Sequence, residues 1–167
     1  MELGCGSGRD GAFLIRNGCD WFGIEGSEGM LMRAIDLHPE LTGRISLHDM
    51  RLPIVYPDTY FDGVFSFAAL MHLDAVNARN ALKEVHRVLV TGAPFLMSVP
   101  LKRMDVDANG CDRDGRFFLP WDDSIWEKAL SGAGFSVEQK KSAHDSMGRD
   151  MEWLNFVARK NTWIDGL

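Results

Sequence analysis

Short apolar segments alternate with amphipathic segments along most of the chain, and this pattern predicts strands that alternate with helices. Ser27 is a suitable N-cap for one helix, and Ser124 with Glu127 has the spacing of a capping box for another. Glycine or proline follows each amphipathic segment and predicts where the helix ends. The predicted helices cover Asp10 to Asn17, Ser27 to about His38, Ala75 to Val90 and Ser124 to about Ser131.

The apolar segments between these helices have the length and composition of strands. They cover Trp21 to Glu25, Arg44 to Asp49, Phe61 to Phe67, Pro94 to Val99, Phe135 to Lys140 and Met151 to Lys160. Strands separated by helices imply right-handed crossovers and a parallel sheet with helices on both faces. The last two strands are joined by about ten polar residues with no helical pattern, so we expect the final strand to run antiparallel.

A glycine-rich turn near the start of the chain predicts a nucleotide site. Residues 2 to 8 read Glu-Leu-Gly-Cys-Gly-Ser-Gly, and Glu25 closes the next apolar run 21 residues after Gly4. Glycines let main-chain N–H groups approach a ligand where a strand leads into a helix. An acid at the tip of the next strand is placed to accept hydrogen bonds from ribose hydroxyls.

The spacing of the turn separates two kinds of nucleotide. Dinucleotide sites use G-x-G-x-x-G, whereas Gly4, Gly6 and Gly8 form G-x-G-x-G with acidic Glu2 before them. A carboxylate at this place would repel a pyrophosphate but suits S-adenosylmethionine (SAM), which carries an ammonium and a sulfonium. SAM is therefore favoured. An NAD-dependent oxidoreductase stays as an alternative, although the chain has no Tyr-x-x-x-Lys pair of the short-chain type.

With these motifs the chain resembles the class I SAM-dependent methyltransferases over nearly all of its 167 residues. Residues 2–8 match that family's first motif and residues 23–27 are similar to its second. Residues 48–50, 61–67 and 84–89 are similar to its adenine-contacting turn, its fourth strand and the helix before its fifth strand. The resemblance implies a three-layer α-β-α sandwich around a mostly parallel seven-stranded sheet with an antiparallel last strand.

The resemblance also implies a SAM site. The glycines would line the methionine end with Glu2 near the ammonium through water, Glu25 would bind the ribose diol, and Asp49 with the Met50 N–H would contact adenine. Each has a structural alternative, namely a tight turn, a solvated strand end and an ordinary loop aspartate. The implied cofactor-binding residues are Glu2, Gly4, Cys5, Gly6, Gly8, Glu25, Gly26, Ser27, Met30, Asp49, Met50, Ser66 and Phe67.

One departure from the family concerns the start of the chain. Family members have a helix and a full first strand before the glycine turn, whereas only Met1, Glu2 and Leu3 precede it here. A central strand normally needs about five or six residues. We therefore expect a truncated first strand and a chain that lacks its natural N-terminus.

Composition fits one domain over residues 1–167, with 46% hydrophobic residues. The sequence indicates neither a membrane span nor a signal peptide. Three cysteines without CxxC spacing predict free thiols, no metal site and a reducing, cytoplasmic location. The net charge of −6 makes nucleic acid an unlikely partner. No oligomeric state follows from the sequence.

The acceptor side has fewer signals. Residues 66–69 contain neither proline nor amide, which disfavours adenine or glutamine N-methylation, and the Pro-Cys nucleophile of cytosine C5 enzymes is absent. His72 is the candidate general base for a hydroxyl, thiol or protonated amine, with a packing histidine as the alternative. Candidate acceptor-binding residues are Arg116, Phe117 and Trp121, in the aperiodic segment after the fifth strand, and Arg149 before the last strand.

These observations predict a methyltransferase that transfers a methyl group from SAM to an O, N or S atom of a small-molecule acceptor. Two alternatives stay open. One is a protein or RNA methyltransferase acting with a partner that supplies a basic surface. The other is a non-catalytic, SAM-binding assembly subunit.

Overall fold

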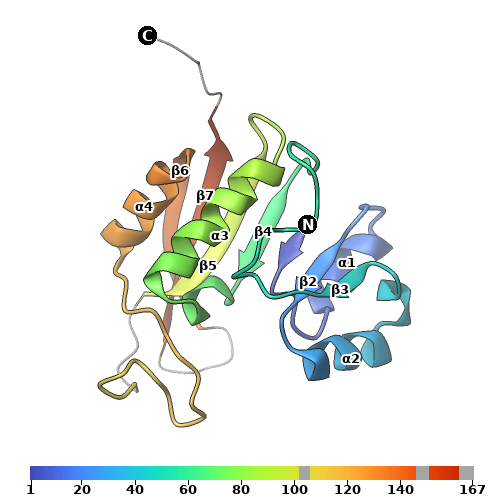
Figure 1. The fold of residues 1–167 in the computed structure, drawn as a ribbon, viewed down its shortest axis with the longest axis horizontal. Helices are drawn as coiled ribbons and strands as arrows, with labels where there is room; N and C mark the ends of the chain where they lie inside the picture. Colours follow the sequence, from blue (N-terminus) through green and yellow to red (C-terminus); the bar gives the residue numbers. More distant parts are fainter. Residues whose placement is uncertain (102–105, 146–150, 162–167) are drawn as a thin grey trace.

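A computed structural model describes residues 1–101, 106–145 and 151–161 and contains one seven-stranded sheet of order β3-β2-β1-β4-β5-β7-β6 (Figure 1). Neighbouring strands are parallel except where β7 pairs, antiparallel, with β5 and β6. The strands are β1 (Glu2–Leu3), β2 (Gly23–Glu25), β3 (Ile45–Leu47), β4 (Val64–Phe67), β5 (Pro94–Pro100), β6 (Phe135–His144) and β7 (Glu152–Lys160). The predicted sheet and its antiparallel last strand are confirmed.

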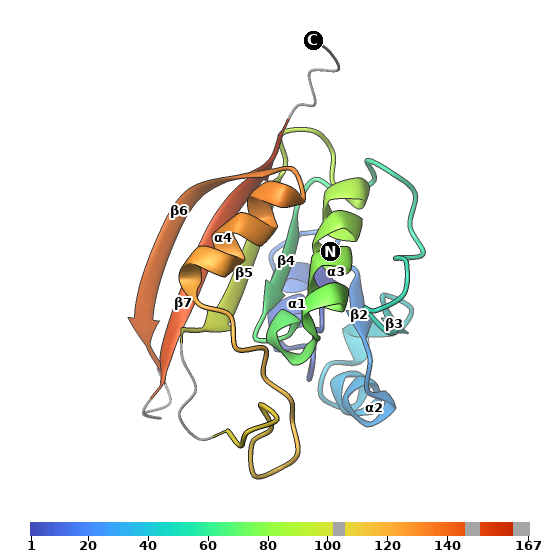
Figure 2. The same ribbon diagram turned by 60° about the vertical axis from the view of Figure 1, so that its left-hand side comes forward.

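Helices cover both faces of the sheet. Figure 2 shows α3 and α4 in front of the sheet and α1 behind it. The helices are α1 (Arg9–Arg16), α2 (Glu28–Leu37), α3 (Ala75–Val88) and α4 (Asp123–Gly132), with short 3-10 helices η1 (Pro39–Leu41) and η2 (Leu70–His72). The three-layer arrangement is therefore confirmed, and the four predicted helices are present within two residues of the predicted bounds.

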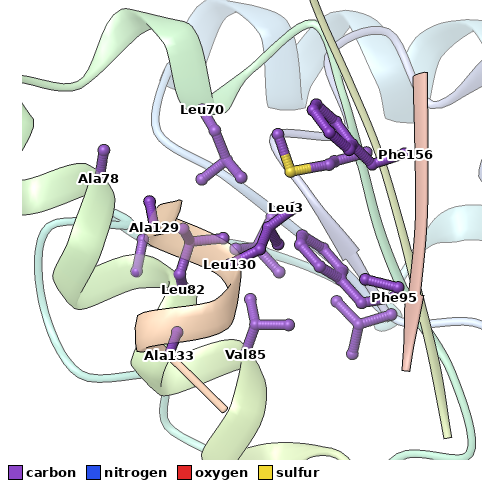
Figure 3. Close-up of a cluster of buried hydrophobic side chains, with 14 of the residues drawn as sticks. Leu3, Leu70, Ala78, Leu82, Val85, Phe95, Ala129, Leu130, Ala133 and Phe156 are labelled. Carbon is purple, nitrogen blue, oxygen red and sulfur yellow. The ribbon is translucent and has the colours of Figure 1, made fainter. Parts of the chain in front are cut away.

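The larger hydrophobic core lies between the sheet and the pair α3–α4. Figure 3 shows Leu82 and Val85 of α3 and Leu130 of α4 directed toward Leu3 and Phe95 of the sheet, and all five side chains are fully buried. A smaller cluster around Trp21 packs α1 and α2 on the other face. The periodicity of α3 predicts this burial because its apolar positions share one face.

The helix starts show one correction. The Ser27 hydroxyl accepts a hydrogen bond from the Met30 N–H, as predicted. For α4, however, Asp122 is the N-cap: its carboxylate accepts from the Ile125 N–H at 2.9 Å and from the Ser124 hydroxyl at 2.8 Å. The predicted capping box is wrong because an ionised carboxylate two residues earlier satisfies the same orphan donors.

The long connection between β3 and β4 has no helix and is held by one arginine of α3. The Arg87 guanidinium donates to the carbonyls of Ile54 and Tyr56 and to the carboxylates of Glu84 and Asp58, at 2.7–3.0 Å. Glu84 also accepts from the Ile54 N–H. This network fixes the loop that leads back into β4.

We expect Arg87→Ala to lower the free energy of unfolding by about 2 kcal/mol, because several charge-assisted bonds are lost and partly buried carbonyls stay unpaired. Urea unfolding measures this change. Arg9→Ala is the control, because among the described residues Arg9 is paired only with Asp10 on the surface and such pairs contribute less than about 1 kcal/mol. Equal losses in the two variants would contradict a bracing role for Arg87.

Candidate functional site

The site lies where the strand order reverses, between β1 and β4, at the carboxyl ends of the parallel strands. The glycine turn follows β1 directly, and Gly4, Gly6 and Gly8 have φ values of 69°, 54° and 74°. An added Cβ would lie 2.4 Å from the Ala69 Cβ at Gly4 and 2.2 Å from a Leu41 methyl at Gly8. At Gly6 the nearest atom would be the Met30 methyl at 3.6 Å. Gly4 and Gly8 are therefore required by packing, and Gly6 is the open side of the turn.

Glu25 clamps this turn from the end of β2. Its carboxylate accepts hydrogen bonds from the Gly6 N–H at 2.7 Å and from the Ser27 N–H at 2.9 Å. Each bond uses a different oxygen, and a carboxylate oxygen can accept a second bond. The free lone pairs fit the two hydroxyls of a ribose, so the residues present are suited to a nucleoside.

Two methionines lie against the turn. The Met50 methyl would be 3.2 Å from a Cβ added at Gly4, opposite Ala69, and Met30 lies beside Gly6. Asp49, which precedes Met50, accepts three hydrogen bonds from the Arg51 guanidinium and one from the Arg51 N–H. The Arg51 side chain lowers the Asp49 pKa, so this carboxylate stays an ionised acceptor. The structure thus gathers five of the predicted residues: Gly4, Gly6, Glu25, Met30 and Met50.

Glu2 lies beneath the turn, and its burial contradicts the expectation that its charge would repel a pyrophosphate. It is only 3% exposed, and the Trp21 indole N–H donates to its carboxylate at 3.1 Å. Burial first, and the charge of Asp10 second, raise its pKa to about 8. Glu2 is therefore mostly neutral at pH 7, and charge repulsion at this residue does not separate a pyrophosphate from SAM.

The side chains of three further predicted cofactor contacts have partners or surroundings of their own, so their roles toward a cofactor stay predictions. The Cys5 side chain is 6% exposed within the core beside Trp21, which leaves only its backbone for a ligand. Ser66 is fully buried and donates to the Leu3 carbonyl, so it joins β4 to β1. The Phe67 ring lies with Phe65 along a groove of about 660 Å³ beside α1.

The two residues after the Glu25 strand end have separate roles. Ser27 uses its hydroxyl as the N-cap of α2. Gly26 is exposed and has only the His48 carbonyl near it, 3.8 Å from an added Cβ. Both remain predicted cofactor neighbours through their backbone.

His72, at the end of η2, is exposed and oriented by a backbone acceptor. Its Nδ1 lies 2.8 Å from the Phe117 carbonyl oxygen, and the ring packs edge-on against Phe118 at 4.7 Å. A carbonyl only accepts, so Nδ1 carries the proton and Nε2 holds the lone pair. This is the arrangement that a general base requires.

Phe118 also lines a cavity of about 390 Å³. Apolar side chains from the end of β5 and from the segment before α4 form its walls, among them Leu101, Phe118, Leu119 and Trp121. Trp121 is 8% exposed and packs edge-on against Trp126 at 4.7 Å, so it is a rigid wall rather than a mobile side chain. This segment meets η2 through a hydrogen bond from the Leu119 N–H to the Met71 carbonyl.

The other acceptor candidates have partners of their own or lie outside the described residues. Arg116 forms ion pairs with Asp112 at 2.6 Å and Asp114 at 3.2 Å, and its role toward an acceptor stays a prediction. Phe117 contributes its carbonyl to His72, and its ring packs against Gly110. Arg149 lies outside the described residues.

Sequence reasoning missed the backbone at the end of β4. Ala68 has a left-handed φ of 56°, which costs a residue with a side chain about 1–2 kcal/mol. Its N–H donates to both the carbonyl and the hydroxyl of Ser98, at 3.0 and 3.2 Å. An alanine in a left-handed conformation and a serine inside a strand have no sequence signature.

Within residues 1–101, 106–145 and 151–161, no helix is long and apolar enough to cross a membrane. The same residues contain no group of three or more histidine, cysteine or acidic side chains able to hold a metal ion.

Comparison with known proteins connects this site to an activity. Residues 1–92, more than half of the chain, match the family described as "Methyltransferase domain". An 18S rRNA (guanine-N(7))-methyltransferase of Mus musculus is 34% identical over 80 residues, and its counterpart in Bos taurus is equally similar. The match covers 48% of this chain and about 28% of the length of each curated relative.

Two solved structures share the fold over nearly the whole chain. A SAM-dependent methyltransferase from Mesorhizobium loti has a TM-score of 0.75 and 22% identity, with 95% of this chain and 89% of that chain covered. The Burkholderia thailandensis 1,6-didemethyltoxoflavin-N1-methyltransferase, with 1,6-didemethyltoxoflavin and S-adenosylhomocysteine bound, has a TM-score of 0.77 and 18% identity. There the match covers 96% of this chain and 70% of that chain.

The raised pKa of Glu2 predicts a pH-dependent cost of folding. The pKa of about 8 in the folded protein lies above the ordinary value of 4.5, so the contribution of Glu2 to stability is complete below pH 4.5 and falls as the pH rises toward 8. Glu2→Gln keeps an acceptor for Trp21 and removes this titration. Relative to wild type, the free energy of unfolding of Glu2→Gln should increase by about 3 kcal/mol between pH 5 and pH 8.5. Urea unfolding at the two pH values measures this change.

The exposed Glu28→Gln is the control, and its difference from wild type should be the same at both pH values. A Glu2→Gln difference that does not change with pH would show that Glu2 titrates normally.

Proposed function

Because the chain belongs to the class I SAM-dependent methyltransferase family and uses SAM as its cofactor, we propose that it methylates an O, N or S atom of a small-molecule acceptor bound beside His72. The observation that carries this proposal is the shared wall of Phe118. Its ring packs edge-on against the oriented imidazole of His72, and the same residue lines the apolar cavity. A cavity of about 390 Å³ is within the range of small-molecule sites.

The glycine turn and the ends of β2 and β3 hold the cofactor in this proposal. Glu25 binds the ribose diol with its free lone pairs, and Gly6 provides the open backbone at the methionine end. Asp49 accepts from the adenine amino group while the Met50 N–H binds a ring nitrogen. Bound SAM supplies a methyl group that its sulfonium already activates toward a nucleophile.

The acceptor side then needs little chemistry. His72 Nε2 takes the proton of the attacking hydroxyl, thiol or ammonium while Phe117 holds Nδ1–H. The nucleophile would take the methyl carbon of SAM held by the glycine turn and Glu25, and the electron pair of the S–C bond would stay on sulfur. The apolar walls exclude water and keep the acceptor in line, and such positioning can contribute about 7–11 kcal/mol to catalysis.

RNA is the second candidate acceptor, because the curated relatives are named for methylation of 18S rRNA. The net charge of −6 disfavours unaided binding to RNA. In addition, Arg51 and Arg116 are both paired with aspartates. An RNA substrate would therefore require a partner that supplies the basic surface, and that assembly is the alternative to the small-molecule proposal.

Glu25→Ala should weaken SAM binding by more than tenfold, because it removes the proposed charge-assisted bonds to ribose and the clamp on the turn. Isothermal titration calorimetry with SAM and S-adenosylhomocysteine measures the change. Glu28→Ala, three residues further on, is the matched control and should bind as wild type does. Unchanged affinity in Glu25→Ala would exclude the ribose role.

The acceptor class is tested with methyl-labelled SAM. The protein is incubated with a small-molecule extract and, separately, with ribosomal RNA, and label is counted in each fraction. We expect label in small molecules, reduced at least a hundredfold by His72→Gln, with SAM affinity unchanged. Label confined to RNA would replace the proposed acceptor. Full activity of His72→Gln would remove its role as the base.

A further inference from the structure

We propose that Ser98 of β5 is a positioning residue for the methyl transfer. Its hydroxyl holds the strained turn at Ala68 and so sets where His72 stands relative to the glycine turn. This inference rests on the proposed function, because it concerns the alignment of the same base and cofactor turn.

The first step concerns the strain at Ala68. Among the described residues only Thr59 and Ala68 combine a side chain with a positive φ. A left-handed alanine persists only where its surroundings enforce it. Ala68 follows β4 directly, at the carboxyl edge of the sheet, so the chain is turned sharply where the site begins.

The second step identifies what enforces the turn. The register of β4 with β5 pairs Phe67 with Ser98. The Ala68 N–H accordingly donates to the Ser98 carbonyl, as the strand pairing requires, and also to the Ser98 hydroxyl. The second acceptor is supplied by the side chain alone, so it depends on the identity of residue 98.

The third step follows the chain after the turn. The Ala69 methyl lies against Gly4, where an added Cβ would be 2.4 Å from it. The Ala69 carbonyl then accepts from the His72 N–H at 3.0 Å and closes η2. His72 reaches the Phe117 carbonyl from this short helix. Relaxation of Ala68 would therefore move Ala69 away from the glycine turn and His72 away from Phe117 together.

The experiment uses the imidazole ¹⁵N signals of His72, assigned with His72→Gln and recorded at alkaline pH, together with SAM affinity. Wild type should show the tautomer with the proton on Nδ1. In Ser98→Ala the two ¹⁵N shifts should move toward the average of both tautomers, and SAM affinity should fall about fivefold. Ser98→Thr keeps the hydroxyl and should match wild type in both measurements.

Two further variants separate positioning from general stability. Ser66→Ala removes a buried hydroxyl from the adjacent strand β4, where it bonds Leu3 rather than Ala68. It should lower the melting temperature without moving the His72 signals. Ala68→Gly makes the left-handed turn free of strain, so the double variant Ala68→Gly/Ser98→Ala should recover the wild-type signals. If Ser98→Ala does not fold, the double variant still tests the proposal.

The outcomes are distinct from those of the proposed function. If wild type binds SAM and Ser98→Ala leaves both the His72 signals and the SAM affinity unchanged, only the positioning role is overturned. Equal His72 shifts in Ser66→Ala and Ser98→Ala would also overturn it. Wild type that fails to bind SAM would instead remove the function on which the inference rests.

Discussion

The close approach of Gly4 to Ala69 is the constraint on which the rest of the site depends. It joins the turn after β1 to the segment after β4, the two neighbours at which the strand order reverses. No side chain fits between them, so Gly4 must be glycine and Ala68 must turn sharply to bring Ala69 into place. The cofactor turn and the short helix that carries His72 are therefore parts of one packed unit.

Polar groups beneath and beside this unit have different energetic roles. Glu25 lies at the surface end of its strand and stays an acceptor for two backbone N–H groups. Glu2 lies under the turn, where burial raises its pKa and Trp21 is its donor. Two acids that flank one glycine turn thus have different donors, because Glu25 accepts from the backbone and Glu2 from a buried indole.

The family match covers the cofactor side of the site but not the cavity on the acceptor side. The family match ends at residue 92, before β5, and covers the glycine turn, Glu25, Asp49 and His72. The walls of the cavity come from residues 100–101, 106 and 118–122, beyond that match. Loops vary more readily than the strands and helices they connect. The family is consequently shown by comparison, and the acceptor is a matter of proposal.

The sequence by itself determined the sheet, its reversed last strand, the helices and the nucleotide turn, because these depend on periodicity and on backbone freedom over short distances. Gly4, Gly6 and Glu25 could be found from spacing for the same reason. Only the tertiary structure decided that Glu2 is buried, with a raised pKa, and that Ser66 joins two strands. It also decided that Asp112 pairs with Arg116. At the start of α4, it placed Asp122 rather than Ser124 as the cap. It also brought Ser98 to Ala68 and Phe117 to His72. These contacts join residues 30 and 45 positions apart, and desolvation and long-range pairing depend on which segments pack together, which no local pattern encodes.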